Sequence, residues 1–186
     1  AQWLGMGKSL LQKNAAFRLE IARIEKAFSK HVDWTLTEEI EKADAVRFNR
    51  LDIIQPLLFA MAAGIAASLR TLGIEPSAVV GHSQGEVAAA YVAGGLSLED
   101  AALIICLRSR LVEKTRGSGH MMVVGLSMAE AEAELVRFDG TISVAASNGP
   151  STTILSGDAK AAETLATELE ARGVFVRLLK VGYASH

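Results

Sequence analysis

One short apolar run near the middle of the chain is followed by a sharp change in residue pattern. Ala78–Val80 is apolar, Gly81–Gly85 is rich in glycine and polar residues, and residues 86–91 are good helix formers. A short apolar run next to turn residues is typical of a buried strand in a parallel sheet. The pattern therefore predicts a strand, a tight turn and a helix, in that order.

The residues before this run carry the spacing of helices. We expect helices at residues 8–19, 18–29, 37–40 and 56–72, and an extended segment at residues 49–54. Pro56 suits the first position of the last helix, and Gly73 suits its end. The apolar stretch at 56–67 is shorter than the about 20 residues that a membrane span needs. We therefore expect a helix that is buried beneath a sheet.

A further helix is predicted at residues 97–114, after the glycine pair Gly94–Gly95. It begins with a Ser-x-x-Asp sequence, which has the form of a capping box with Asp in place of Glu or Gln. One face of this helix carries the apolar residues Ile104, Leu107 and Leu111. Arg108 and Arg110 cannot both share that face, so at least one of them points elsewhere.

The pattern changes again at Gly117–Gly119, which we interpret as a subdomain boundary. Beyond it, strands are predicted at residues 120–126, 142–146, 152–156 and 174–179, and helices at 127–138 and 158–172. The order strand, helix, strand, strand, helix, strand is that of a ferredoxin-like split βαβ unit. We therefore expect a large subdomain at residues 1–118, continued by residues 183–186, and a small subdomain at residues 119–182.

Composition and charge restrict the classes of function. The 186 residues are 50% hydrophobic and carry a net charge of −2 without a long run of one sign, which argues against nucleic acid or a membrane as the main partner. Cys106 is the only cysteine and lies among apolar residues, so we expect core packing, no internal disulfide and a cytoplasmic location. No Cys/His cluster has the spacing of metal ligands, and we expect no metal and no permanently bound cofactor.

The segment Gly81-His82-Ser83-Gln84-Gly85 fits the G-x-S-x-G pattern of a nucleophile elbow. In that arrangement Ser83 lies on a sharp turn, and Gly81 and Gly85 allow the flanking strand and helix to approach closely. The backbone N–H of Gln84 and the positive end of the helix dipole face the site of an oxyanion. The alternative is a serine in a glycine-rich turn without chemistry.

Several motifs in the same order resemble the acyltransferase domain of modular polyketide synthases, and the malonyltransferases of fatty-acid synthesis. They are residues 81–86 with the sequence G-H-S-Q-G-E, Arg108, and residues 183–186 with the sequence Y-A-S-H, together with residues 1–7, 148–150 and 156–157. The resemblance implies an α/β fold, with a hydrolase-like large subdomain built on a parallel sheet and an inserted ferredoxin-like small subdomain. It also implies that the chain is truncated at both ends, and Gln2 does not replace the family's glutamine near the oxyanion site.

The resemblance implies a role for each candidate residue. Ser83 becomes acylated, and His186 takes the serine proton and returns it to the leaving thiol. Arg108, 25 residues after Ser83, pairs with the free carboxylate of a malonyl-type substrate through its planar guanidinium. Without the resemblance, His186 and Arg108 would be read as solvated surface residues. Arg110 is a weaker rival because its spacing does not match.

Further motifs resemble those of family members that select methylmalonyl units. These are Tyr183 and Ser185 in Y-A-S-H, Gln84 after the serine, and the segment Arg50–Gln55. Malonyl-selecting members usually carry H-A-F-H, and a serine in place of that phenylalanine leaves room for a methyl group. One methyl is worth only about 1–3 kcal/mol in an apolar pocket, so selectivity would be a modest preference.

The resulting hypothesis is an acyltransferase that moves an extender unit, methylmalonyl rather than malonyl, from coenzyme A to the phosphopantetheine thiol of an acyl carrier protein. A ketosynthase domain would flank it in the parent chain. Three alternatives are a malonyl-specific transferase of the same family, a thioesterase of the α/β-hydrolase type, and a non-catalytic module that docks a carrier protein. A thioesterase has no use for Arg108, and a docking module needs neither Ser83 nor His186.

Overall fold

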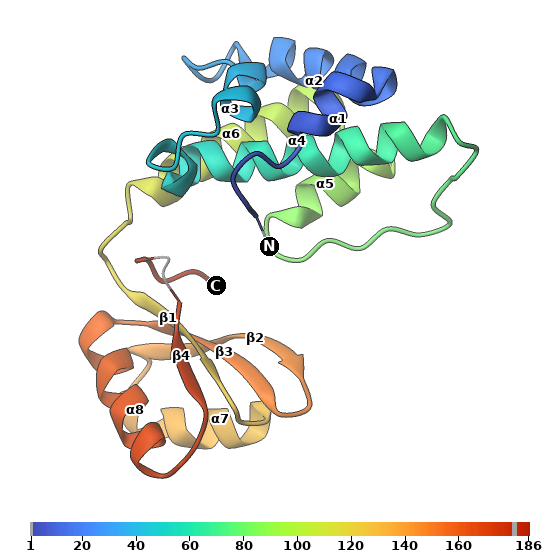
Figure 1. Ribbon diagram of the computed structural model, residues 1–186. Coiled ribbons are helices and arrows are strands. Elements are labelled where there is room, and N and C mark those ends of the chain that lie inside the picture. Colours follow the sequence, from blue (N-terminus) through green and yellow to red (C-terminus); the bar gives the residue numbers. More distant parts are fainter. Residues whose placement is uncertain (1, 180–181) are drawn as a thin grey trace. The chain divides into compact units, whose positions relative to one another are not determined.

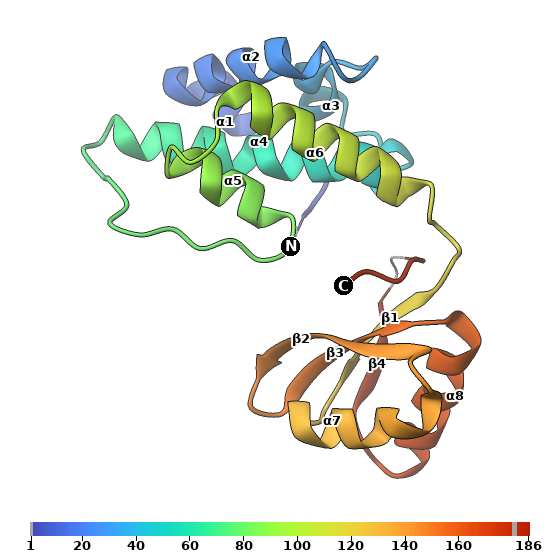
Figure 2. The ribbon, with the colours of Figure 1, turned by 180° about the vertical axis from the view of Figure 1, so that it is seen from behind.

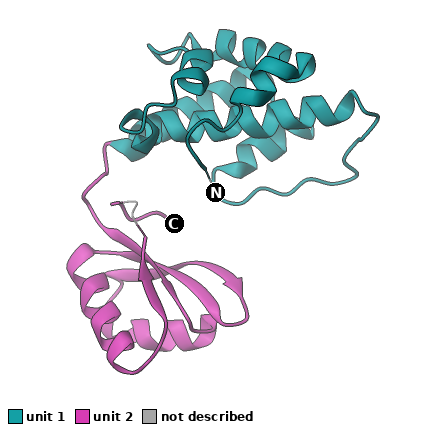
Figure 3. Ribbon diagram, in the orientation of Figure 1, with its two compact units in different colours: residues 1–113 teal, residues 114–186 magenta. Residues whose placement is uncertain are grey.

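The computed structural model describes residues 2–179 and 182–186 and divides into two compact units (Figure 3). Unit 1 comprises residues 1–113 and unit 2 comprises residues 114–186. The division lies five residues before the boundary expected between residues 118 and 119. The segment 183–186, which we expected to continue the large subdomain, groups with unit 2.

Every regular element in the described residues of unit 1 is a helix or a helical turn. Its elements are α1 (Lys8–Lys13), α2 (Ala15–Phe28), α3 (Leu36–Lys42), the 3-10 turn η1 (Arg47–Asn49), α4 (Leu51–Arg70), α5 (Gly85–Val92) and α6 (Leu98–Glu113). Helix α4 packs against α2, α5 and α6 (Figure 1). Most of its buried side chains are apolar. The fully buried Phe17, Phe28 and Phe59 show that the core of unit 1 lies between α2 and α4.

The first predicted helix, at residues 8–19, is in fact two helices that meet at Asn14. Asn14 has extended backbone angles, with φ −114° and ψ 113°, and its side chain accepts a hydrogen bond from the Phe17 N–H at 2.9 Å. This bond satisfies one of the N–H groups that lack a partner at a helix start. The capping preference of asparagine therefore overrides the continuous apolar spacing, and α2 begins at Ala15.

Helix α4 begins at Leu51, so the predicted extended segment at 49–54 is wrong. The Leu51 N–H donates to Oε2 of Glu113 at 2.8 Å, which satisfies one donor of the first turn. Pro56 lies inside the helix instead of opening it. With 20 residues, α4 is long and apolar enough by length and composition to cross a bilayer, but 61% of its most apolar window is buried within the structure. Such burial is what a core helix of a globular protein shows.

The connection between α4 and α5 contains no strand, so the predicted buried strand at Ala78–Val80 is not formed. These residues have no regular structure, and the Val80 side chain is 94% exposed. A strand is stable only when its backbone N–H and C=O groups pair with a neighbour. All strands of the described residues belong to unit 2, and therefore nothing in unit 1 offers a ladder to this segment (Figures 1 and 2).

Unit 2 has the element order that the pattern predicted. Its elements are β1 (His120–Val124), α7 (Met128–Leu135), the 3-10 turn η2 (Val136–Phe138), β2 (Ile142–Gly149), β3 (Thr152–Gly157), α8 (Ala159–Ala171) and β4 (Val176–Leu178). The sheet order is β2-β3-β1-β4, and all neighbouring pairs are antiparallel. This is the split βαβ arrangement. The capping box predicted at the start of α7 is present, formed by Ser127 and Glu130.

The two faces of this sheet differ. Met122, Val124 and Leu155 point towards α7 and α8 and form the core of unit 2 with residues of those helices. Because successive strand residues point to opposite faces, Met121 and Ser156, which are partners in the ladder, lie on the other face. Ser156 is nevertheless buried, with 4% of its surface exposed.

Candidate active site

The turn that carries Ser83 has the backbone geometry of a strained elbow. Ser83 has a φ of 54°, in the left-handed region that non-glycine residues rarely adopt. The turn is closed by hydrogen bonds from Gly85 N–H to the His82 carbonyl at 3.0 Å and from Glu86 N–H to the Ser83 carbonyl at 3.1 Å. Backbone strain of this kind clusters at active sites, where it presents a side chain. The Ser83 side chain lies at the exposed start of α5.

The two glycines of the motif differ in their packing. A Cβ added to Gly81 would lie 2.3 Å from both N and Cα of Glu86, which is too close for any side chain. The chain can therefore enter α5 at this angle only with glycine at position 81. A Cβ added to Gly85 would meet nothing within 4 Å. The close approach that we expected at Gly85 is therefore absent among the described residues.

Gln84 is the N-cap residue of α5, directly after the candidate nucleophile. Its φ of −58° and ψ of −17° are helical, and its side chain makes no capping bond. No backbone hydrogen bond among the described residues uses its N–H as donor. Within the same residues its side-chain Oε1 is buried without a hydrogen-bond partner. Gln84 thus keeps both a backbone donor and a side-chain acceptor at the elbow.

Arg108 is half-buried on α6 and is held by a residue of α4. Its Nη1 donates to Oε1 of Gln55 at 2.7 Å, and Gln55 is only 6% exposed. The spacing of the sequence gave no sign of this partner, since the two residues are 53 positions apart. A glutamine at a buried position of an otherwise apolar helix is the signal that could have indicated a polar contact. Arg110 is exposed.

The apolar face predicted for α6 is exposed in the described residues. Ile104 is 39% exposed, Leu107 is 39% exposed and Leu111 is 52% exposed. The buried face instead carries Ile105 and four small side chains, namely Ala101, Ala102, Cys106 and Ser109. Helix α6 packs with this face against α4 and α2, and small residues allow the helices to approach. The three apolar residues do share one face of α6, but unit 1 buries a different face of this helix.

Cys106 is a core residue, as predicted. Its side chain is 3% exposed, and burial raises the pKa of its thiol to about 12, although the nearby Arg110 guanidinium acts in the opposite direction. A thiol with such a pKa carries almost no thiolate at neutral pH and is a poor nucleophile. Among the residues that the structure describes, no group of three or more His, Cys, Asp or Glu side chains could hold a metal ion.

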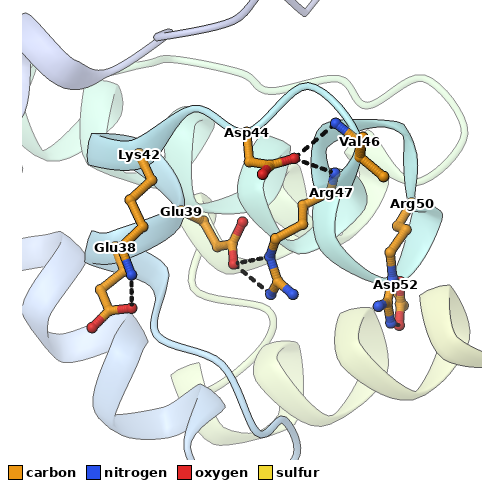
Figure 4. Close-up of polar contacts among 8 residues, drawn as sticks. All are labelled: Glu38, Glu39, Lys42, Asp44, Val46, Arg47, Arg50 and Asp52. Atoms are coloured by element: carbon orange, nitrogen blue, oxygen red, sulfur yellow. Dashed lines mark hydrogen bonds and ion pairs between the residues drawn. The ribbon is translucent and has the colours of Figure 1, made fainter.

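The Arg50–Gln55 segment forms the start of α4. Arg50 donates two hydrogen bonds to Asp52, from Nε to Oδ1 at 3.0 Å and from Nη2 to Oδ2 at 2.6 Å (Figure 4). This pair places a carboxylate in the first turn of the helix, where the dipole favours negative charge. Just before it, Asp44 accepts hydrogen bonds from the N–H groups of Val46 and Arg47, which lower the pKa of the Asp44 carboxyl. The segment thus fixes the start of the helix that carries Gln55.

The Tyr183–His186 segment is anchored on the sheet of unit 2. The Ser185 N–H donates to Oγ of Ser156 at 2.8 Å, and the Gly117 N–H donates to the Gly182 carbonyl. Tyr183 is buried, whereas His186 is exposed and has a positive φ of 65°.

The candidate residues fall into two groups. Ser83, Gln84 and Arg108 belong to unit 1, where α5 packs against α4 and α6. Tyr183, Ser185 and His186 belong to unit 2.

Residues 1–186 match the family model described as the acyl transferase domain. The chain belongs to this family. The resemblance to polyketide synthase acyltransferases is thereby confirmed, and a serine nucleophile is the general mechanism of the family.

Two curated relatives are similar over the whole chain. The chain is 43% identical to erythronolide synthase EryA3 of Saccharopolyspora erythraea and 45% identical to the pikromycin polyketide synthase component PikAIII of Streptomyces venezuelae. In each case 100% of the chain is aligned. It spans only 6% of the first relative and 12% of the second.

Solved structures confirm the predicted α/β fold class. The acyltransferase domain from module 8 of the salinomycin polyketide synthase matches with a TM-score of 0.94 at 37% identity, over 100% of this chain and 44% of that chain. A loading acyltransferase from the avermectin modular polyketide synthase matches with a TM-score of 0.92 at 38% identity, over 100% and 60%. MCAT from Streptococcus pneumoniae matches at 25% identity with a TM-score of 0.83, over 100% and 61%.

Proposed function

We propose that the protein transfers an extender unit, methylmalonyl in preference to malonyl, from coenzyme A to an acyl carrier protein. The observation that carries this proposal is the elbow at Ser83, with its positive φ and the backbone contact that only glycine at position 81 permits. A serine hydroxyl held on such a turn at the start of a helix is suited to attack a carbonyl carbon. Family membership supports the same class of reaction.

In the first half-reaction, Ser83 Oγ attacks the thioester carbonyl and forms an acyl ester. His186 accepts the serine proton and returns it to the sulfur of coenzyme A as the carbon–sulfur bond breaks. The Gln84 N–H donates to the oxyanion of the tetrahedral intermediate. In the second half, the phosphopantetheine thiol of the carrier protein gives its proton to His186 and attacks the ester carbonyl. The bond between the acyl carbon and Ser83 Oγ then breaks, and His186 returns the proton to Oγ. The two steps balance without a permanent cofactor or metal.

The guanidinium of Arg108 gives the reaction its preference for carboxylated acyl groups. A guanidinium has five N–H donors, and the bond to Gln55 uses one of them, so a planar pair remains available for a carboxylate. The choice of methylmalonyl is supported by the small side chain of Ser185 in the Y-A-S-H segment and by Gln84. Sequence similarity to multidomain synthases supports a cytoplasmic location, with a carrier protein and a flanking ketosynthase domain as partners.

The test is mass spectrometry of the native polypeptide that contains these residues after incubation with methylmalonyl-coenzyme A. We expect a stable acyl adduct on the peptide that contains Ser83, transfer of the acyl group to an added carrier protein, and no adduct in Ser83→Ala. Ser97→Ala is the matched control, because Ser97 also precedes a helix but does not have a positive φ. Rapid release of free acid would indicate a thioesterase, and no adduct at all would indicate a docking module.

A further inference from the structure

Ser156 joins the sheet of unit 2 to the segment that ends in His186. Its Oγ accepts a hydrogen bond from the Ser185 N–H at 2.8 Å, and the donor is the residue directly before the candidate catalytic base. Ser156 belongs to β3 and pairs with Met121 of β1 and Ser143 of β2, so its own backbone is held by the ladder on both sides. A fixed hydroxyl therefore holds a segment that has no regular secondary structure of its own.

The buried position of this hydroxyl indicates that the contact is specific. Ser156 is 4% exposed and lies on the sheet face opposite α7 and α8, where an apolar side chain would otherwise be expected. A buried hydroxyl is disfavoured unless it is hydrogen-bonded. Here its oxygen takes up a backbone N–H that no strand partner satisfies, so each group meets the requirement of the other.

Two glycines contact the same segment, one by close packing and one by a hydrogen bond. A Cβ on Gly119 would lie 2.8 Å from the Ala184 Cβ and 2.5 Å from the Gly157 carbonyl oxygen. The Gly117 N–H donates to the Gly182 carbonyl. The segment is thus held at Gly182, packed at Ala184 and held again at Ser185, and His186 is the next residue.

We propose that Ser156 is a positioning residue for His186, an inference that rests on the proposed function. By fixing the backbone at Ser185, the Ser156 hydroxyl sets where the chain places His186 relative to the sheet of unit 2. A displacement of about 1 Å in a catalytic group can lower a rate by about a hundredfold. Loss of one of these three contacts leaves the fold of unit 2 intact but increases the mobility of His186.

The experiment is a double-mutant cycle on the native polypeptide, read as the single-turnover rate of Ser83 acylation by methylmalonyl-coenzyme A. We expect Ser156→Ala to lower this rate about tenfold and Ser156→Thr, which keeps the hydroxyl, to restore most of it. In a His186→Ala background, Ser156→Ala should lower the rate by less than about twofold, because a residue that acts through the base has nothing left to position.

Thr153→Val is the matched control. Thr153 is a fully buried residue of the same strand whose Oγ1 donates to the Leu126 carbonyl at 2.9 Å, away from the Tyr183–His186 segment. It should leave the rate within about twofold of wild type. Equal losses from Ser156→Ala in both backgrounds would overturn the positioning role alone. A His186→Ala variant that acylates at the wild-type rate would overturn both this role and the proposed base.

Discussion

Arg108 on α6 donates from Nη1 to Oε1 of Gln55 on α4 at 2.7 Å. The side-chain amide oxygen of the buried Gln55 thus binds one edge of the Arg108 guanidinium. Gln55 lies on α4, and the packing of α4 against α2, α5 and α6 fixes its position. A flexible surface arginine would lose side-chain entropy when it captured a ligand, whereas this guanidinium is partly immobilised beforehand. This immobilisation supports the proposed role of Arg108 in binding a planar carboxylate.

Arg108→Ala is expected to change which acyl groups the protein accepts. Arg108 is half-buried, and removing one partner of a buried ion pair costs several kcal/mol, so the carboxylate of methylmalonyl-coenzyme A should bind less well once its proposed partner is gone. Propionyl-coenzyme A has no such carboxylate and should react almost as before. The ratio of kcat/KM for methylmalonyl over propionyl should therefore fall at least about a hundredfold, since each 1.36 kcal/mol is tenfold.

Arg110→Ala is the control for that measurement. Arg110 lies two residues further along α6 and is exposed, so its loss should leave the ratio nearly unchanged. If Arg110→Ala produced the change and Arg108→Ala did not, the assignment of the carboxylate site would be wrong.

Gln55→Leu tests whether the glutamine acts through Arg108. Leucine fills a similar volume but offers no acceptor, and a hydrogen bond to a charged group is worth about 1.5–3 kcal/mol. We expect the methylmalonyl over propionyl ratio to fall about tenfold, with little change in kcat/KM for propionyl. In an Arg108→Ala background the same substitution should have almost no effect on the ratio. A full effect in that background would show that Gln55 contacts the substrate itself.

Local chemistry explains which parts of unit 1 could be predicted. The elbow turn depends on residues within a few positions of Ser83, and the sequence predicted it correctly. The strand at Ala78–Val80 depends on partners that are distant in sequence, and the described residues of unit 1 provide none. The start of α4 was misplaced because Pro56 is a strong local signal, whereas the Leu51 N–H is satisfied by Glu113, 62 positions away.

Unit 2 was more predictable because its signals are repeated. Short apolar runs bounded by glycine and polar residues mark the strands, and the Ser127–Glu130 capping box marks the start of α7. The hydrogen bond between Ser156 and Ser185 could not be read from the sequence, since it depends on how the chain returns to β3 after 29 residues. A bond from a backbone N–H to a serine hydroxyl leaves no recognisable pattern in the sequence.

Gly81→Ala and Gly85→Ala form a matched pair at the elbow. Alanine at position 81 would place its Cβ 2.3 Å from backbone atoms of Glu86, so α5 must shift, and we expect a loss of several kcal/mol in stability. Alanine at position 85 meets nothing within 4 Å and should change stability by about 1 kcal/mol or less. Urea unfolding followed by tryptophan fluorescence reports on unit 1, because Trp3 and Trp34 both lie there. Similar losses for both variants would contradict the assigned packing.

The contribution of Tyr91 to the stability of unit 1 should depend on pH in the alkaline range. Its Oη donates to Oε1 of Glu20, a residue of α2 that is 6% exposed and also pairs with Arg23. Burial raises the pKa of Tyr91 from 10.0 to about 12, and the bond to the Glu20 carboxylate acts in the same direction. The folded state therefore holds the phenol proton more tightly than the unfolded state does, and folding favours the neutral form.

The sign of the pH dependence follows from this difference. Below about pH 10 both states are protonated and the contribution of Tyr91 is complete, whereas between pH 10 and about 12 only the unfolded state loses its proton. Stability should fall over that interval as the pH rises. Tyr91→Phe, which removes the titrating group, should be less stable than wild type at pH 8 but should lose stability less steeply above pH 10. Urea midpoints measured by circular dichroism at pH 8, 10 and 11 would test this, and parallel slopes for the two proteins would show that Tyr91 is not held by Glu20.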